Sequence, residues 1–353
     1  MNFKNSISLK AGKKALKILK KDGLKVDDIG VVAGAAGGPK WLILRNLDRA
    51  IFGTWLKDRK TPLPLIGSSI ATWRFACIAS PDPESAFQKF EDSYINQSYV
   101  DNKKSSFISS ESLKIIDNYL DGNMEEVLNH PFYRLNIMTT KCKWPLSSSN
   151  KLIQILGFSI AYTLNLICRD YLNTLFKRGL FFDKRFKPDF FKSDQFKTEY
   201  YKIEKDNFKK ALLASGSIPI VMDGVRINQG IYRDGGVLDY NMDLKYENTD
   251  RIVLFPHYSD RIIPGWLDKK LNRRKPFEQT LDKMLMISPS EKLIGDLPNK
   301  KIPDREDFMN LTDSDRIKAW KEVIVKSKVM EDDFLLLTKN KDLLNEVLEP
   351  LTN

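Results

Sequence analysis

The first part of the chain alternates short apolar runs, loops of small residues and helical patterns. An apolar run at 28–33 is followed by the glycine-rich loop at 34–41 (GAAGGPKW), after which apolar residues recur at helical spacing. A second unit follows, with an apolar run at 63–66, the turn at 67–71 (GSSIA) and a helical pattern over 72–78. Repeated strand–loop–helix units predict an α/β sheet with helices packed on its faces.

The pattern divides the chain into three segments. Residues 1–26 place apolar positions at helical spacing among lysines, which predicts a basic amphipathic helix. Residues 27–260 hold the strand–loop–helix units, and further strand patterns at 225–233 and 251–255 complete an α/β domain. Residues 261–353 alternate charged and apolar residues without strand signals, so we expect a helical C-terminal region there.

The longest stretch without a charged residue runs from 152 to 168. It includes Gln154, Tyr162 and Asn165, and it is at or below the roughly 17–25 apolar residues that a membrane-spanning helix needs. We therefore expect a long helix at 152–176 that is buried or interfacial.

Composition indicates a folded protein in a reducing compartment. The 353 residues are 42% hydrophobic, which suffices for a sizeable core. Cys77, Cys142 and Cys168 are odd in number and far apart, which is a poor basis for a disulfide framework. Lysines interrupt every apolar run near the N-terminus, so a signal-peptide pattern is missing. We therefore expect a cytoplasmic protein.

The net charge of +11 favours anionic partners. Nucleic acid is not expected, because the chain carries no recognisable nucleic-acid-binding motif. Residues 1–25 hold eight lysines and one aspartate, and this segment could attract an anionic membrane surface while Leu9, Leu16 and Leu19 enter the headgroup region. The same apolar stripe could instead pack on the α/β core with its lysines solvated.

The turn at 67–71 holds a candidate nucleophile. Ser69 stands between a predicted strand and a predicted helix, with the small residues Gly67 and Ala71 two positions away on either side. This is the pattern of a nucleophile elbow, although glycine is usual where Ala71 stands. A serine hydroxyl is a poor nucleophile until a base takes its proton.

Two residues could serve as that base. Asp234 leaves a predicted strand and is followed by Gly235 and Gly236, which let other backbone approach its carboxylate. His257 also follows a strand, and the order Ser69, Asp234, His257 would suit a triad of the α/β-hydrolase type. The residues alone leave both alternatives open.

The glycine-rich loop supplies a candidate oxyanion hole. Gly37 and Gly38 lie between a strand and a helix, so their N–H groups can point at a developing oxyanion. A phosphate-binding loop is disfavoured, because Pro39 lacks an N–H and Trp41 follows Lys40 where Ser or Thr would bind magnesium. With two histidines and three scattered cysteines, no metal and no cofactor are expected.

Four segments, AGGPK, GSSIA, ALLASGSIPIVM and RDGG, occur in an order that resembles the patatin-like phospholipase family. The third segment is similar to the family's Ala-Ser-x-x-Ile-Pro pattern at Ala214, Ser215, Ile218 and Pro219. Together the four segments span residues 29 to about 241.

The resemblance implies a three-layer α/β/α fold and a serine–aspartate dyad, in which Ser69 attacks an ester carbonyl and Asp234 is the base without histidine. Lys40 stands where the family has a basic residue. The implied activity is hydrolysis of phospholipid or lysophospholipid esters, by a cytoplasmic protein peripheral to the membrane. Two departures, Ala71 in the elbow and Trp41 where the loop usually ends in glycine, keep open a catalytically weak or inactive lipid-binding protein on the same fold.

Overall fold

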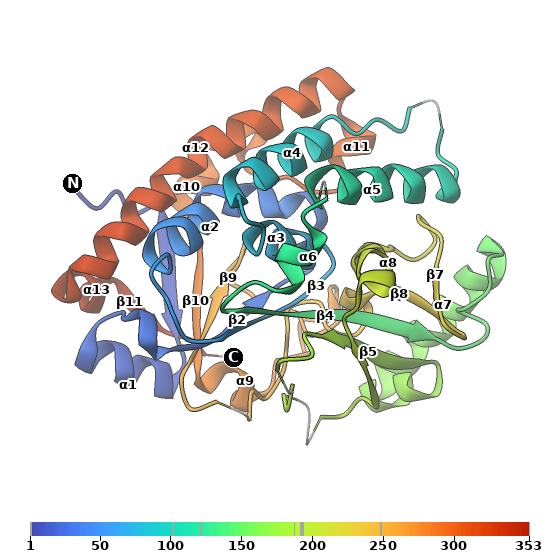
Figure 1. Ribbon diagram of the computed structural model, residues 1–353, viewed down its shortest axis with the longest axis horizontal. Coiled ribbons are helices and arrows are strands. Elements are labelled where there is room, and N and C mark those ends of the chain that lie inside the picture. Colours follow the sequence, from blue (N-terminus) through green and yellow to red (C-terminus); the bar gives the residue numbers. More distant parts are fainter. Residues whose placement is uncertain are drawn as a thin grey trace.

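The computed structural model describes residues 2–100, 102–120, 122–186, 188–190, 194–247 and 249–352. It is a mixed α/β fold with a central, mostly parallel sheet flanked by helices (Figure 1). The strands are β1 (Ile7–Ala11), β2 (Ile29–Gly34), β3 (Leu63–Ser68), β4 (Tyr133–Cys142), β5 (Phe176–Phe182), β6 (Thr198–Lys202), β7 (Val225–Ile227), β8 (Gly230–Asp234), β9 (Ile252–Pro256), β10 (Met284–Pro289) and β11 (Leu348–Pro350).

The helical segments are of two kinds, α-helices and 3-10 or π segments. The α-helices are α1 (Lys13–Asp22), α2 (Arg45–Asp48), α3 (Ile70–Ile78), α4 (Pro83–Ile95), α5 (Ser105–Leu120), α6 (Met124–Leu128), α7 (Lys151–Ile167), α8 (Lys205–Gly216), α9 (Glu278–Asp282), α10 (Glu291–Asp296), α11 (Asp307–Asn310), α12 (Asp313–Lys339) and α13 (Lys341–Val347). Short 3-10 or π segments are η1 (Val26–Asp28), η2 (Gly38–Leu44), η3 (Arg49–Trp55), η4 (Arg169–Thr174), η5 (Gly235–Val237), η6 (Trp266–Asp268) and η7 (Pro298–Lys300).

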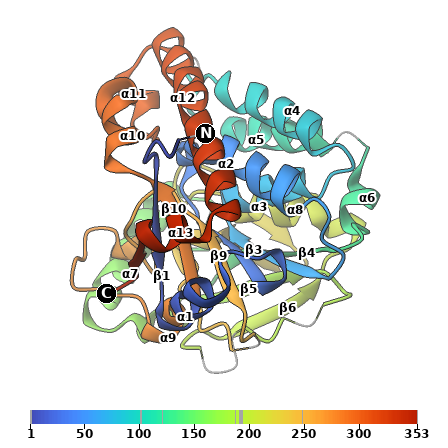
Figure 2. The same ribbon diagram turned by 90° about the vertical axis from the view of Figure 1, so that its left-hand side faces the viewer.

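The sheet has the order β11-β1-β10-β9-β2-β3-β4-β5-β6, with β8 also paired to β4 and β7 to β8. Strands β10, β9, β2, β3 and β4 run parallel to one another, whereas β1 and β5 run antiparallel to β10 and β4. Strands β3 and β9 are buried at every position, which is typical of parallel strands covered on both faces. Figure 2 shows α3, α8 and α12 on one side of the sheet and α1 and α9 on the other.

Both strand–loop–helix units predicted from the hydrophobic pattern are confirmed. The first is β2 followed by η2 and α2, and the second is β3 followed by α3. The helix predicted at 152–176 is shorter than expected, because the backbone is extended at Cys168 and α7 ends at residue 167. No described helix is long and apolar enough to cross a membrane. All three cysteines have free thiols.

The N-terminal segment begins with a strand, so the expectation of a helix reaching back to Leu9 is wrong. Strand β1 alternates buried and half-buried positions, and Leu9 is buried where the strand pairs with β10 and β11. In α1, Leu19 is also buried and Leu16 is half-buried, while the lysines are mostly exposed. The apolar stripe packs on the sheet, so the expectation that Leu9 and Leu19 enter a headgroup region is also wrong.

The expectation of a strand-free C-terminal region is wrong as well. Strand β10 is buried along its whole length and lies between β1 and β9, and β11 pairs with β1. The helices expected there are confirmed as α12 and α13, and α12 packs against α2 and η2. One sheet therefore includes strands from all three expected segments. The short apolar run at 284–289 forms a strand because it pairs with β9 on one side and β1 on the other.

Candidate active site

Strand β4 brings the predicted nucleophile and the predicted base together. Ser68, the last residue of β3, pairs in parallel with Met138 of β4. The next β4 residue, Thr139, pairs antiparallel with Asp234 at the end of β8. Ser69 and Asp234 are 165 residues apart in sequence. They nevertheless lie close together, because their strands pair with two adjacent residues of β4, Met138 and Thr139.

Ser69 has the strained backbone expected of a tight strand-to-helix turn. Its φ of 56° and ψ of −133° are rare for a residue with a side chain. Its hydroxyl donates a hydrogen bond of 2.8 Å to Oδ2 of Asp234. Its backbone N–H donates to Oγ of Ser215, whose hydroxyl donates to the Met138 carbonyl at 2.6 Å. Ser215, from the ALLASGSIPIVM segment, thus ties the turn to β4.

The methyl group of Ala71 fits because two neighbouring positions lack side chains. A Cβ atom placed on Gly34 would lie 2.6 Å from the Ala71 Cβ, and one placed on Gly67 would lie 3.1 Å from it. Glycine at both positions leaves room for the methyl, so helix α3 still approaches β2 and β3 closely. The departure from glycine at Ala71 is accommodated within the fold.

Trp41 lies in the core and does not line the pocket beside Ser69. Its ring stacks on Phe90 with centroids 4.5 Å apart, and Tyr94 meets it edge-on. The bulk of Trp41 is therefore directed into the aromatic core, away from Ser69.

Asp234 is held by the two glycines that follow it. Its Oδ1 accepts a hydrogen bond of 2.7 Å from the N–H of Gly236. A Cβ on Gly235 would lie only 2.3 Å from the Met138 carbonyl oxygen, so this close approach to β4 requires glycine. Burial raises the pKa of Asp234, and the nearby charge of Arg305 opposes this effect. A carboxylate with a raised pKa is a stronger base near neutral pH.

His257 does not join this pair. Its Nδ1 lies 2.6 Å from the carbonyl oxygen of Ser259, and burial lowers the pKa of its imidazole to about 4. Within the described part of the chain, it makes no hydrogen bond with Ser69 or Asp234. Because the serine donates directly to the aspartate, the geometry favours a dyad over a triad.

Ser69 opens on an apolar pocket of about 290 Å³. The pocket is lined by the glycine-rich loop, by helices α3, α5 and α11, and by the segment that follows α8. Its apolar lining includes Ile70, Trp73, Tyr94, Ile108, Ile218, Val221, Met222, Phe308 and Met309. A long acyl chain matches a lining of this chemistry.

The two candidate oxyanion glycines face different surroundings. Gly38 has a φ of 56° and lines the pocket together with Ser69. A Cβ on Gly37 would lie 2.6 Å from the ring of Tyr258, so Gly37 packs against that ring and does not line the pocket. Gly38 is therefore the better placed of the two to meet a substrate.

Three cationic side chains gather beside the dyad. Lys40 lies over the ring of Tyr258 and Lys269 over the ring of Tyr240, at 4.9 and 4.3 Å from the ring centroids. Burial, together with the charge of Arg305, lowers the pKa of both lysines, and that of Lys269 falls to about 8. Neither lysine forms an ion pair with a described residue.

Arg305 is the site residue that the sequence patterns did not suggest. Its Nη2 lies 4.0 Å from Oδ2 of Asp234, and its Nε lies 3.1 Å from where a Cβ on Gly38 would be. It lines the same pocket as Ser69 but comes from the C-terminal segment, far along the chain from Ser69 and Asp234. No local motif marks it.

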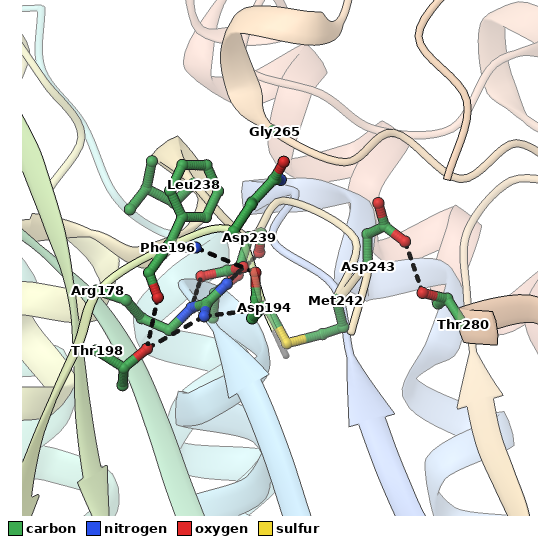
Figure 3. Close-up of polar contacts among 12 residues, drawn as sticks. Arg178, Asp194, Phe196, Thr198, Leu238, Asp239, Met242, Asp243, Gly265 and Thr280 are labelled. Carbon is green, nitrogen blue, oxygen red and sulfur yellow. Dashed lines mark hydrogen bonds and ion pairs between the residues drawn. The ribbon is translucent and has the colours of Figure 1, made fainter. Parts of the chain in front are cut away.

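A buried ion pair fixes the loop that follows Asp234. Arg178 of β5 donates two hydrogen bonds to the carboxylate of Asp239, at 2.8 and 2.7 Å, and pairs with Asp194 at 2.7 Å (Figure 3). The Ser68 hydroxyl donates to the backbone carbonyl of Asp239 at 2.8 Å. The loop is thus anchored both to β5 and to β3, the strand that ends just before Ser69.

Comparison with known proteins does not identify the chemistry of this site. No family model matches the chain, and no curated protein matches it significantly. Across the described ranges, no three His, Cys, Asp or Glu side chains come together in a group that could hold a metal ion. The geometry of the dyad and its pocket therefore carries the functional argument.

Proposed function

We propose that the protein is a patatin-like serine hydrolase that cleaves carboxylic ester bonds of phospholipids or lysophospholipids. The observation that carries this proposal is the 2.8 Å hydrogen bond from Ser69 to Asp234 at a strained strand-to-helix turn. A nucleophile within hydrogen-bonding reach of its base is the arrangement that covalent catalysis by serine requires. The apolar pocket at the same serine supports a lipid substrate.

In the first half of the reaction, Oγ of Ser69 bonds to the ester carbonyl carbon while Asp234 takes the hydroxyl proton. The carbonyl electrons move to oxygen, and that charge is stabilised by N–H groups of the loop at Gly37 and Gly38 and by the N-terminus of α3. When the carbon–oxygen bond of the ester breaks, the leaving alcohol takes the proton from Asp234, which leaves an acyl group on Ser69.

In the second half, Asp234 takes a proton from water as the water oxygen bonds to the acyl carbon. Collapse of this intermediate breaks the bond to Oγ, returns the proton to Ser69 and releases the fatty acid. The same carboxylate serves as base and then as acid in both halves, so no histidine is needed.

The charges around the site support a phosphate-bearing substrate. Lys40, Lys269 and Arg305 supply positive charge beside the dyad, where a headgroup phosphate would stand next to the scissile ester. A phospholipid substrate agrees with the expectation of a cytoplasmic enzyme peripheral to the membrane, and the exposed lysines within residues 1–25 are one of two alternative contacts with an anionic surface.

A serine-directed fluorophosphonate probe combined with a lipid hydrolysis panel tests the proposal. Wild type should be labelled and should release fatty acid, whereas Ser69→Ala and Asp234→Asn should each lose nearly all hydrolysis, since a dyad acts as one unit. Ser112→Ala is the matched control, because Ser112 lines the same pocket and its loss should leave labelling intact.

The alternatives give different results in the same assays. His257→Ala should keep most activity, and loss as complete as in Ser69→Ala would favour the Ser69–Asp234–His257 triad instead. Wild type that binds lipid but is neither labelled nor active would favour a lipid-binding protein on the same fold.

A further inference from the structure

Helix α7 presents its apolar side to solvent. Its buried positions include the polar residues Gln154 and Asn165. Its exposed positions include large hydrophobic side chains with exposed fractions between 38% and 76%, namely Leu152, Ile155, Leu156, Ile160, Tyr162 and Ile167. A surface helix of a globular domain normally has the opposite arrangement.

Hydrogen bonds hold α7 in this orientation. The Gln154 side chain accepts from the N–H of Ile220 at 3.3 Å, and the Asn165 side chain donates to Asp268 at 2.7 Å. Rotating the helix to bury its apolar side would break both bonds. The exposed apolar face, defined by the six hydrophobic residues named above, is therefore fixed by the fold.

Basic and aromatic residues frame this apolar face. No acidic residue occurs from 143 to 169. Lys151 is exposed at the N-terminal end of α7, and the exposed Lys143 donates to the carbonyl groups of Asn173 and Thr174, which follow the helix. At the other end, the side chains of Arg273 and Arg274 donate to the last carbonyl groups of α7, each at 2.6 Å. The nearest acidic residue in sequence, Asp170, comes directly after this stretch.

Amphipathic aromatic rings lie beside the same face. Trp144 is 76% exposed, and the residues after it, Pro145 and Leu146, pack against α7 at Gly157. Tyr171 is also exposed just beyond the helix. Tryptophan and tyrosine concentrate where proteins meet the interface between lipid and water.

A segment that hydrogen-bonds to α7 also lines the catalytic pocket. The N–H of Ile220 donates to Gln154, on the buried side of α7, and Ile220 lies between the pocket-lining residues Ile218 and Val221. Val221 and Met309 line the pocket and are themselves exposed. One short segment therefore joins α7 to the pocket beside Ser69.

We propose that the exposed face of α7 docks on the surface of an anionic phospholipid bilayer, with its apolar side chains in the headgroup region and its basic frame against lipid phosphates. An apolar face edged by positive charge complements such a surface. The proposal assigns docking to a different surface from the lysines of α1, which lie at the opposite end of the molecule (Figure 1). Only the delivery of substrate, and not docking itself, rests on the proposed hydrolase function.

Cosedimentation with phosphatidylglycerol–phosphatidylcholine vesicles tests the docking. The variant Leu156→Asp with Ile160→Asp should bind at least about tenfold more weakly than wild type, because it places two charges on the inserted face. Its melting temperature should match that of wild type, which shows that it is folded whether or not the protein is a hydrolase. Val325→Asp is the matched control, since Val325 is also an exposed apolar residue but lies on α12, and it should bind like wild type.

Several outcomes would overturn the proposal. The first is that wild type fails to bind anionic vesicles, and the second is that the double variant binds them as tightly as wild type. A third is a wild-type dimer that the double variant converts to a monomer, because the face would then cover a second copy of the chain. Binding lost in Lys17→Gln with Lys20→Gln but kept in the α7 variant would assign docking to α1. Ser69→Ala should still bind vesicles, because docking does not depend on catalysis. Vesicle binding therefore tests the docking proposal even if the hydrolase proposal fails.

Discussion

Replacing Arg305 with glutamine should shift the acidic limb of the pH–rate profile to higher pH. The Arg305 guanidinium lies 4.0 Å from the Asp234 carboxylate and favours its charged form. Two unit charges at that separation interact by about 4 kcal/mol at an effective dielectric constant of about 20. Because the Arg305 side chain is 37% exposed, solvent screening reduces this to about 1 kcal/mol.

The assay is the pH dependence of kcat/KM on a soluble short-chain ester, since this quantity reports the ionisation of the free enzyme. Without Arg305, Asp234 holds its proton to higher pH, so the acidic limb should move up by about half to one pH unit. Lys300→Gln is the control, because it removes the same charge from an exposed position that does not perturb Asp234. A limb that stays in place, or moves to lower pH, would refute Asp234 as the base under the influence of Arg305.

Three further predictions concern stability. Arg178→Met leaves the carboxylate of Asp239 buried without its main partner, so the free energy of unfolding measured in urea should fall by about 3–5 kcal/mol. Wild type should lose stability as the pH drops from 6.5, the usual histidine pKa, through about 4, the pKa of His257 in the folded protein, because the unfolded chain binds the proton more readily. In His257→Phe, the melting temperature should therefore fall less between pH 6.5 and 4, and an unchanged pH dependence would contradict this. Deleting residues 1–22 removes β1 from the sheet. The melting temperature, the hydrolysis of vesicle lipid and the hydrolysis of a soluble ester should therefore all fall together. Loss of vesicle hydrolysis alone would contradict a structural role for this segment.

Much of the local structure was predictable because it depends on residues close together in sequence. The small residues around Ser69 permit a tight turn between a strand and a helix, and the structure has that turn with the strained backbone it requires. Gly235 and Gly236 likewise indicate a close backbone approach after Asp234, which β4 provides. In both cases the backbone conformation follows from the absence of a side chain at a nearby position.

Other features depended on partners far away in the chain. Strand β10 is a short apolar run that becomes a strand only because β9 and β1 offer it hydrogen bonds. The sequence predicts a helix where β1 lies, because Leu9 also fits a helical period. Arg305 reaches the dyad from a segment with no motif.

The turns of small residues at Ser69 and Asp234 can be predicted from the sequence alone, since backbone freedom is a local property. Three other features arise only in the folded chain: β4 brings the Ser69 hydroxyl to 2.8 Å from Oδ2 of Asp234, Arg305 lies beside them, and α7 turns its apolar side outward. They do so because hydrogen bonding, burial and charge depend on distances between side chains. Residues more than a hundred positions apart acquire those distances only when the sheet has formed.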